Sequence, residues 1–269
     1  MAFLTIDVVL LLPESLHRAA LAASALLVER MAAHDRPSSF QLGEPLPGPV
    51  GPMSRDRSGE GICEPHVSLF MLRLDPRDVD PLLAAVQSVA SILPAVQAFG
   101  QRWEHNPQGA PELYFHPSEQ WTRVQRAVVA VAEPLRSGLR DTDPSGGCPA
   151  EVIERLRRED PTEPRLAQLT RYGYDEITDD LAANFSPHVT VAWPSTDFQV
   201  DLRGLAPASD WNGVLAELAV FEMGRNGTCI RPFGSFPLTR PESPSDPASG
   251  GESAAEMVGF LSHVDRQER

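Results

Sequence analysis

Cysteines are few in this sequence, and none is placed for a disulfide framework. Cys63, Cys148 and Cys229 are the three cysteines among 269 residues, and no C-x-x-C pair occurs. Small secreted proteins that depend on disulfides carry even numbers of cysteines at regular spacings. The cysteine content therefore indicates a reducing compartment, and we expect a cytoplasmic protein.

Long hydrophobic runs are also missing. No apolar segment reaches the roughly 20 residues that a membrane-spanning helix needs. The apolar run 6–12 is interrupted by Asp7, has no basic segment before it and is followed by Pro13, which is not the pattern of a secretory signal. We therefore expect no export signal and no membrane partner.

Basic residues are too few to balance the acidic ones. The chain has 23 Lys and Arg against 37 Asp and Glu, for a formal net charge of −14. Binding to long nucleic acids through their phosphates requires a positively charged surface, so we expect no large nucleic-acid surface. A small anionic ligand is still permitted, because a local pocket need not follow the net charge.

The hydrophobic periodicity alternates between strand-like and helix-like segments. We expect helices over 15–33, with Ser15 as the cap, and over 78–91, 116–139 and 150–160. Besides the two strands described below, we expect strands over 3–12, 40–42, 93–103, 112–115, 215–223 and 229–238. Asn226-Gly227 is typical of a hairpin turn between the last two strands. This order predicts an α+β protein in which helices cover the outer faces of two antiparallel-rich sheets.

The composition also predicts domain boundaries. Residues 1–240 are expected to form one domain of two lobes, with an insertion over 141–180 and a long loop over 35–61. Residues 241–269 are rich in Pro, Ser, Gly and Glu and are expected to be a disordered tail.

Two short stretches of the chain are nearly copies of each other. The first is Pro65-His66-Val67-Ser68-Leu69, and the second is Pro187-His188-Val189-Thr190-Val191, within a strand expected over 184–193. Side chains alternate between the two faces of a strand. Each stretch therefore places one imidazole and one hydroxyl group on a polar face and its aliphatic residues on the core face. We expect a pseudo-twofold arrangement that brings the two polar faces together across one cleft.

Two histidines that face one cleft are suited to acid–base chemistry on a phosphodiester. One neutral imidazole accepts a proton from the nucleophile, and one imidazolium donates a proton to the leaving oxygen. The hydroxyl groups of Ser68 and Thr190 lie two residues further along and can donate to the phosphate oxygens. This scheme requires neither a metal nor another cofactor.

The paired pattern of His, an aliphatic residue and Ser or Thr resembles the two-histidine (2H) phosphoesterase superfamily. That superfamily includes 2′,3′-cyclic nucleotide phosphodiesterases and 2′-5′ RNA ligase-like proteins. The resemblance covers about residues 1–240 and depends on His66, Ser68, His188 and Thr190. It implies a bilobal α+β cleft, His66 and His188 as catalytic residues, Ser68 and Thr190 as phosphate-binding residues, and metal-independent opening of a cyclic phosphate or the reverse ligation. We expect a monomer that acts on a small nucleotide-like phosphoester or an RNA end.

Five other residues are candidates for contacts with the substrate. Phe70 lies two positions after Ser68, on the polar face if the strand is regular, where it could stack on a base or form an apolar wall. The inserted segment could reach a ligand through Arg165, Arg171, Tyr172 and Tyr174, or these residues could serve only in packing and on the surface.

Three alternatives remain beside the enzyme. The same fold could be a non-catalytic module that binds nucleotides or RNA ends. A metal site could use His66 and His188 with Cys63 or Cys229, although no short-range pair of metal ligands occurs. The Pro-rich loop and the acidic tail could also bind a protein partner.

Overall fold

Two four-stranded antiparallel sheets form the centre of the molecule. The computed structural model describes residues 3–45, 62–141 and 149–239. The first sheet has the order β10-β9-β1-β3 and the second sheet has the order β6-β5-β4-β8. The strands of the first sheet are β1 (Leu4–Leu11), β3 (His66–Leu74), β9 (Glu217–Met223) and β10 (Cys229–Pro237). Those of the second sheet are β4 (Val96–His105), β5 (Pro111–Phe115), β6 (His188–Thr190) and β8 (Asn212–Leu215).

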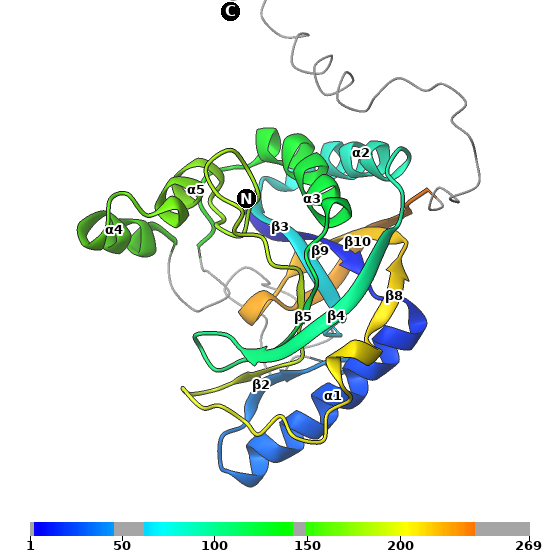
Figure 1. The fold of residues 1–269 in the computed structure, drawn as a ribbon. Helices are drawn as coiled ribbons and strands as arrows, with labels where there is room; N and C mark the ends of the chain where they lie inside the picture. Colours follow the sequence, from blue (N-terminus) through cyan, green and yellow to red (C-terminus); the bar gives the residue numbers. More distant parts are fainter. Residues whose placement is uncertain (1–2, 46–61, 142–148, 240–269) are drawn as a thin grey trace, which may run out of the picture.

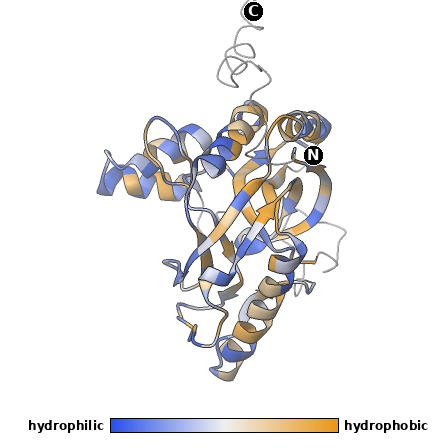
Figure 2. Ribbon diagram, turned by 45° about the vertical axis from the view of Figure 1, so that its right-hand side comes forward, coloured by the Kyte–Doolittle hydropathy of each residue, from blue (hydrophilic) through white to orange (hydrophobic). Residues whose placement is uncertain are grey.

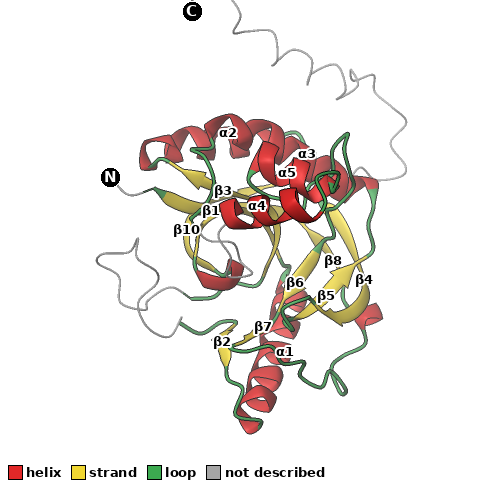
Figure 3. Ribbon diagram, turned by 90° about the vertical axis from the view of Figure 1, so that its left-hand side faces the viewer, coloured by secondary structure: helices red, strands yellow, loops and turns green. Residues whose placement is uncertain are grey.

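Three helices cover these sheets from opposite sides of the molecule (Figures 1 and 3). The helices are α1 (Glu14–Ala33), α2 (Val79–Ala90) and α3 (Glu119–Ala132). Helices α2 and α3 pack on each other and against strands of the first sheet. Helix α1 packs against β8 and against a small sheet of β2 (Ser38–Gln41) and β7 (Ala192–Pro194). The predicted α+β class with antiparallel sheets and outer helices is confirmed.

One hydrophobic core joins the two sheets. It contains residues of both, such as Leu10 and Leu69 from the first sheet and Leu113 and Phe115 from the second. The strands and the inward faces of the helices carry most of the hydrophobic residues in Figure 2. Because the core is continuous, the edge strands β3 and β6, which carry the two histidine motifs, are held against each other.

The segment predicted as an insertion contains two further helices, α4 (Pro149–Glu159) and α5 (Pro164–Tyr172). They pack on each other through a small apolar cluster of their own, which includes Ile153, Leu166 and Leu169. Helix α5 ends at Gly173, whose φ of 67° suits a helix C-terminus. This segment therefore has a small apolar core of its own.

Three of the predicted elements differ from those observed, and strand β8 was not predicted. The second motif strand is split: β6 belongs to the second sheet, and after Val191 the chain turns into β7, which pairs with β2. Helix α3 was expected to reach residue 139, but it ends at Ala132. A short 3₁₀ turn that contains Pro134 follows it. Ser15 lies inside α1 and does not cap it, since Pro13 is the N-cap residue. Strand β8 is not among the predicted strands, because Asn212 and Gly213 lower its strand propensity.

The remaining predictions on domain organisation concern segments that are described only in part. Residues 46–61 of the long loop, residues 142–148 of the insertion and the tail over 241–269 lie outside the described residues. Within the described part of the chain, none of the helices combines the length and the apolar character that crossing a membrane demands.

Candidate active site

The two histidine motifs line one cavity of about 500 Å³. His66 and Ser68 reach it from β3, and His188 and Thr190 reach it from β6. The structure therefore brings together the four residues on which the sequence prediction depends. The rest of the wall comes from the β2–β7 sheet, from the β4–β5 and β9–β10 turns and from the inserted segment.

The first motif is fixed by two short polar contacts. The Nδ1 atom of His66 lies 2.7 Å from the main-chain oxygen of Glu64, and because that oxygen can only accept, Nδ1 carries the proton. The Nε2 atom is then the basic one, and it lies 3.8 Å from the carboxyl group of Asp7. The hydroxyl group of Ser68 donates to the same Asp7 oxygen at 2.7 Å.

The second motif repeats this arrangement. The Nδ1 atom of His188 lies 2.8 Å from the main-chain oxygen of Ser186, again two residues earlier in the chain. Its Nε2 atom lies 3.8 Å from the carboxylate of Glu112, and Thr190 donates to that carboxylate at 3.2 Å. Each motif thus consists of an imidazole, a hydroxyl group and a buried carboxyl group from the neighbouring strand.

Asp7 and Glu112 are the residues that the sequence prediction missed. Asp7 lies on β1 beside β3, and Glu112 lies on β5, where it pairs directly with Thr190 of β6. Both side chains are almost completely buried, at 0% and 5% exposure. A charged residue within the otherwise apolar run 6–12 was the available signal, since a buried ionisable group needs a partner or a function.

The two imidazoles differ in their electrostatic surroundings. Burial lowers the pKa of His66 to about 4, and the positive charge of His188 adds to this effect. Desolvation acts in the same direction on His188, but the carboxylates of Glu112 and Glu176 outweigh it and raise its pKa. Between these two pKa values, His66 is neutral while His188 is protonated.

Phe70 does not lie in the cavity. A bulge in the β1–β3 pairing places Val8 opposite Phe70 and Val9 opposite Ser68, so that the regular alternation of β3 is interrupted. As a result Met71 lines the cavity, and Phe70 is completely buried against the ring of Tyr174. The prediction that Phe70 shares the motif face is therefore wrong, and its apolar role in packing is the one observed.

The other four candidate contacts separate into two groups. Tyr174 and Arg165 line the cavity, and the hydroxyl group of Tyr174 lies 3.4 Å from Glu176. Tyr172 is buried outside the cavity lining, and Arg171 pairs with Asp179 and Asp180. The inserted segment contributes three further lining residues, which are Arg155, Asp175 and Glu176.

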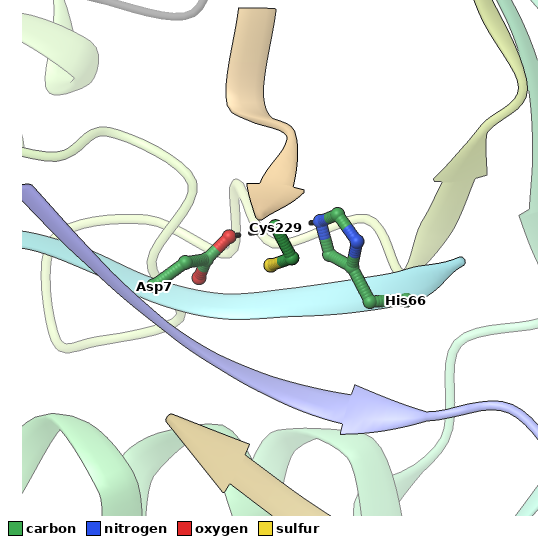
Figure 4. Close-up of side chains that lie close together, drawn as sticks. All are labelled: Asp7, His66 and Cys229. Atoms are coloured by element: carbon green, nitrogen blue, oxygen red, sulfur yellow. Dashed lines mark ion pairs between the residues drawn. The ribbon is translucent and has the colours of Figure 1, made fainter. Parts of the chain in front are cut away.

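Asp7, His66 and Cys229 form a compact group of side chains that could each bind a metal (Figure 4). Their donor atoms lie within 4.8 Å of one another, and among the described residues neither His188 nor Cys63 belongs to such a group. Burial raises the pKa of Cys229 well above its ordinary value and that of Asp7 to about 8, so both side chains carry a proton at neutral pH. A cation bound here would have to displace these two protons. His66 belongs both to this group and to the cavity.

The comparisons with known proteins give structural similarity only. No protein-family model and no curated protein sequence matches this chain. The chain is similar to the crystal structure of TT0787 of Thermus thermophilus, with 16% identity, a TM-score of 0.48 and coverage of 89% of this chain and 100% of that chain.

Two further solved structures are similar at lower scores. E. coli LigT complexed with 3′-AMP has 12% identity and a TM-score of 0.46 over 89% of this chain and 100% of its own. Kluyveromyces marxianus Usb1 has 12% identity and a TM-score of 0.36 over 88% of this chain and 97% of its own.

Proposed function

We propose that this chain is a phosphoesterase that hydrolyses a cyclic phosphodiester of the 2′,3′-cyclic nucleotide type, or a 2′-5′-linked nucleotide, by acid–base catalysis at His66 and His188. The observation that carries the proposal is the placement of two imidazoles in one cavity with pKa values shifted in opposite directions. Pairs of titratable groups that are shifted apart in this way mark the base and the acid of a site.

The reaction needs one base and one acid. The Nε2 atom of His66 accepts a proton from water, whose oxygen forms a bond to phosphorus. The bond from phosphorus to the leaving oxygen breaks, and the imidazolium of His188 donates a proton to that oxygen. Ser68 and Thr190 lie beside the two imidazoles, where their hydroxyl groups can donate to the phosphate oxygens. With a 5′-hydroxyl group in place of water as the nucleophile, the same two residues can open a 2′,3′-cyclic phosphate; the bond to the 3′ oxygen breaks, that oxygen takes the proton of His188, and a 2′-5′ linkage forms.

The dimensions and lining of the cavity support a small substrate. A volume of about 500 Å³ lies within the usual range of small-molecule sites, roughly 300–1,000 Å³. Phe40, Leu42 and Trp193 provide an apolar wall, and Asn106 and Gln108 provide amide groups. This combination suits the flat base and the sugar of a nucleotide.

Hydrolysis of a panel of 2′,3′-cyclic nucleotides and short 2′-5′-linked oligonucleotides, with EDTA present, tests this proposal. We expect turnover in wild type and a loss of about 10²–10⁴-fold in His66→Ala and in His188→Ala, because each variant removes one proton-transfer group. His116→Ala is the matched control, since His116 is exposed and does not line the cavity. It should retain wild-type turnover.

Other outcomes would argue against a two-histidine phosphoesterase. Full activity in either active-site variant would exclude proton transfer by that histidine. Turnover that EDTA abolishes and zinc restores would favour a metal mechanism. A folded wild type with no turnover, but with binding of nucleotides that both variants lose, would support the non-catalytic binding module.

A further inference from the structure

Each motif has one carboxyl group beside it, from Asp7 in the first and Glu112 in the second. These two carboxyl groups have different surroundings. Glu112 accepts hydrogen bonds from Asn106 at 2.7 Å, from the hydroxyl group of Tyr114 at 2.5 Å and from Thr190 at 3.2 Å. An ionised carboxylate only accepts hydrogen bonds, and three donors satisfy it despite its burial. Glu112 therefore has the hydrogen-bond donors that a carboxylate needs beside His188.

Asp7 has no comparable set of partners. Its side chain is 0% exposed, its Oδ2 atom interacts with Ser68, and its Oδ1 atom has no hydrogen-bond partner among the described residues. A buried carboxylate with a single donor is costly, whereas the neutral acid is not. Burial accordingly raises the pKa of Asp7 to about 8, although Ser68 and Arg140 oppose the shift. The other titratable groups around Asp7 are His66, Tyr174, Glu176, His188 and Cys229.

We propose that Asp7 works as a neutral carboxylic acid and Glu112 as a carboxylate, and that this difference makes His66 the base and His188 the acid. The inference rests on the proposed phosphoesterase function. Both carboxyl groups are positioning residues, because they act through the imidazole and the hydroxyl group beside them.

The neutral form of Asp7 has a direct consequence for Ser68. A hydroxyl group has one proton, so a Ser68 that donates to Asp7 cannot also donate to a phosphate. When Asp7 carries the proton, its own O–H group donates across the same 2.7 Å contact to the Ser68 oxygen. The Ser68 proton is then directed into the cavity. On the other side, Asn106 and Tyr114 satisfy Glu112 when Thr190 turns to the substrate.

Two conservative variants separate the roles of the carboxyl groups. Asp7→Asn keeps a donor of the same shape without a charge, so we expect its kcat to fall only about 3-fold. Glu112→Gln removes the charge that keeps His188 protonated, so we expect a loss of about 100-fold. We also expect the alkaline limb of the pH–rate profile to move to lower pH in Glu112→Gln, and not to move to lower pH in Asp7→Asn. An equal loss in both variants, or an alkaline limb that moves to lower pH in Asp7→Asn as well, would overturn the inference.

The pH dependence of unfolding tests the neutral Asp7 without any substrate. A carboxyl group with a folded pKa of about 8 instead of 3.8 binds a proton in the folded state that the unfolded state has lost. The free energy of unfolding of the wild type therefore decreases through this group as the pH rises from about 4 to 8. The amide of Asp7→Asn does not titrate, so the melting temperature of the variant should rise relative to wild type over that interval. A constant difference would contradict a neutral Asp7, even if no substrate of the enzyme were found.

Discussion

At the scale of single residues, each imidazole of the cavity has a hydroxyl group and a carboxyl group beside it. Main-chain oxygens hold both Nδ1 atoms at 2.7 and 2.8 Å, which directs both Nε2 atoms toward the carboxyl groups. Hydrogen bonds of this length fix the ring orientation and the tautomer. The hydroxyl groups of Ser68 and Thr190 are the remaining polar side-chain groups of the two motifs in the cavity.

The hydroxyl groups of Ser68 and Thr190 are predicted to act mainly in the transition state. Removing one donor that stabilises developing charge typically costs about 10²–10³-fold in kcat, so we expect losses near the lower end in Ser68→Ala and in Thr190→Ala. Thr190→Ser keeps the hydroxyl group and is the matched control, with most of the activity retained. Steady-state kinetics give the measurement. A change confined to KM would mean that the hydroxyl groups bind substrate and transition state equally.

The site residues that could be predicted are those that follow from the period of a strand. His66 with Ser68, and His188 with Thr190, are two positions apart, so alternation alone places each pair on one face. Asp7 and Glu112 join them through pairing with residues 61 and 78 positions away, which local spacing does not contain. The position of Phe70 could not be predicted for a related reason, because a bulge depends on the partner strand.

At the scale of elements, the β4–β5 turn connects the second sheet to the site. The Asn106 side chain accepts hydrogen bonds from the main chain of Gln108 and Ala110, and it donates to Glu112. Gly109 closes this turn with a φ of 83°, and a Cβ atom there would lie 2.6 Å from the main-chain oxygen of Phe198. The geometry of the turn therefore controls one of the three donors to the Glu112 carboxylate.

Gly109→Ala is predicted to disturb both stability and the site. A positive φ costs a residue with a Cβ atom about 1–2 kcal/mol, and the contact with Phe198 should raise the total to about 3 kcal/mol. Gly138→Ala is the control, since Gly138 has a φ of 85° with no atom within 4 Å of the added Cβ. Urea unfolding and kcat should both be affected more in Gly109→Ala. Equal effects of the two substitutions would show that the turn does not depend on this close approach.

The elements themselves were predictable where a hydrophobic period continues over several residues. The run 6–12 is apolar apart from Asp7, and Trp121, Val124 and Val128 repeat at helical spacing, so β1 and α3 could be predicted from the sequence. The split between β6 and β7 could not be predicted, because each half pairs with a strand far away in the chain. Pro134 could have indicated the end of α3, since a proline interrupts the helical hydrogen bonds.

At the scale of the whole molecule, the two histidines lie in one cavity between two sheets, and their pKa values are shifted in opposite directions. Contact between the edge strands β3 and β6 brings the imidazoles into the same buried space. There burial, together with the charge of His188, lowers the pKa of His66, while the carboxylates of Glu112 and Glu176 raise the pKa of His188 against the effect of desolvation. Neither sheet alone would produce this difference, because each contributes one histidine.

The most direct test of the account is an NMR titration of the two imidazoles in the substrate-free protein, with each resonance assigned from His66→Ala and His188→Ala. We predict that His66 titrates near pH 4 and that His188 titrates above 6.5. We also predict that the pKa of His66 rises in His188→Ala, because the neighbouring charge is removed. Titration of both rings near 6.5, or a lower pKa for His188 than for His66, would contradict the assignment of base and acid.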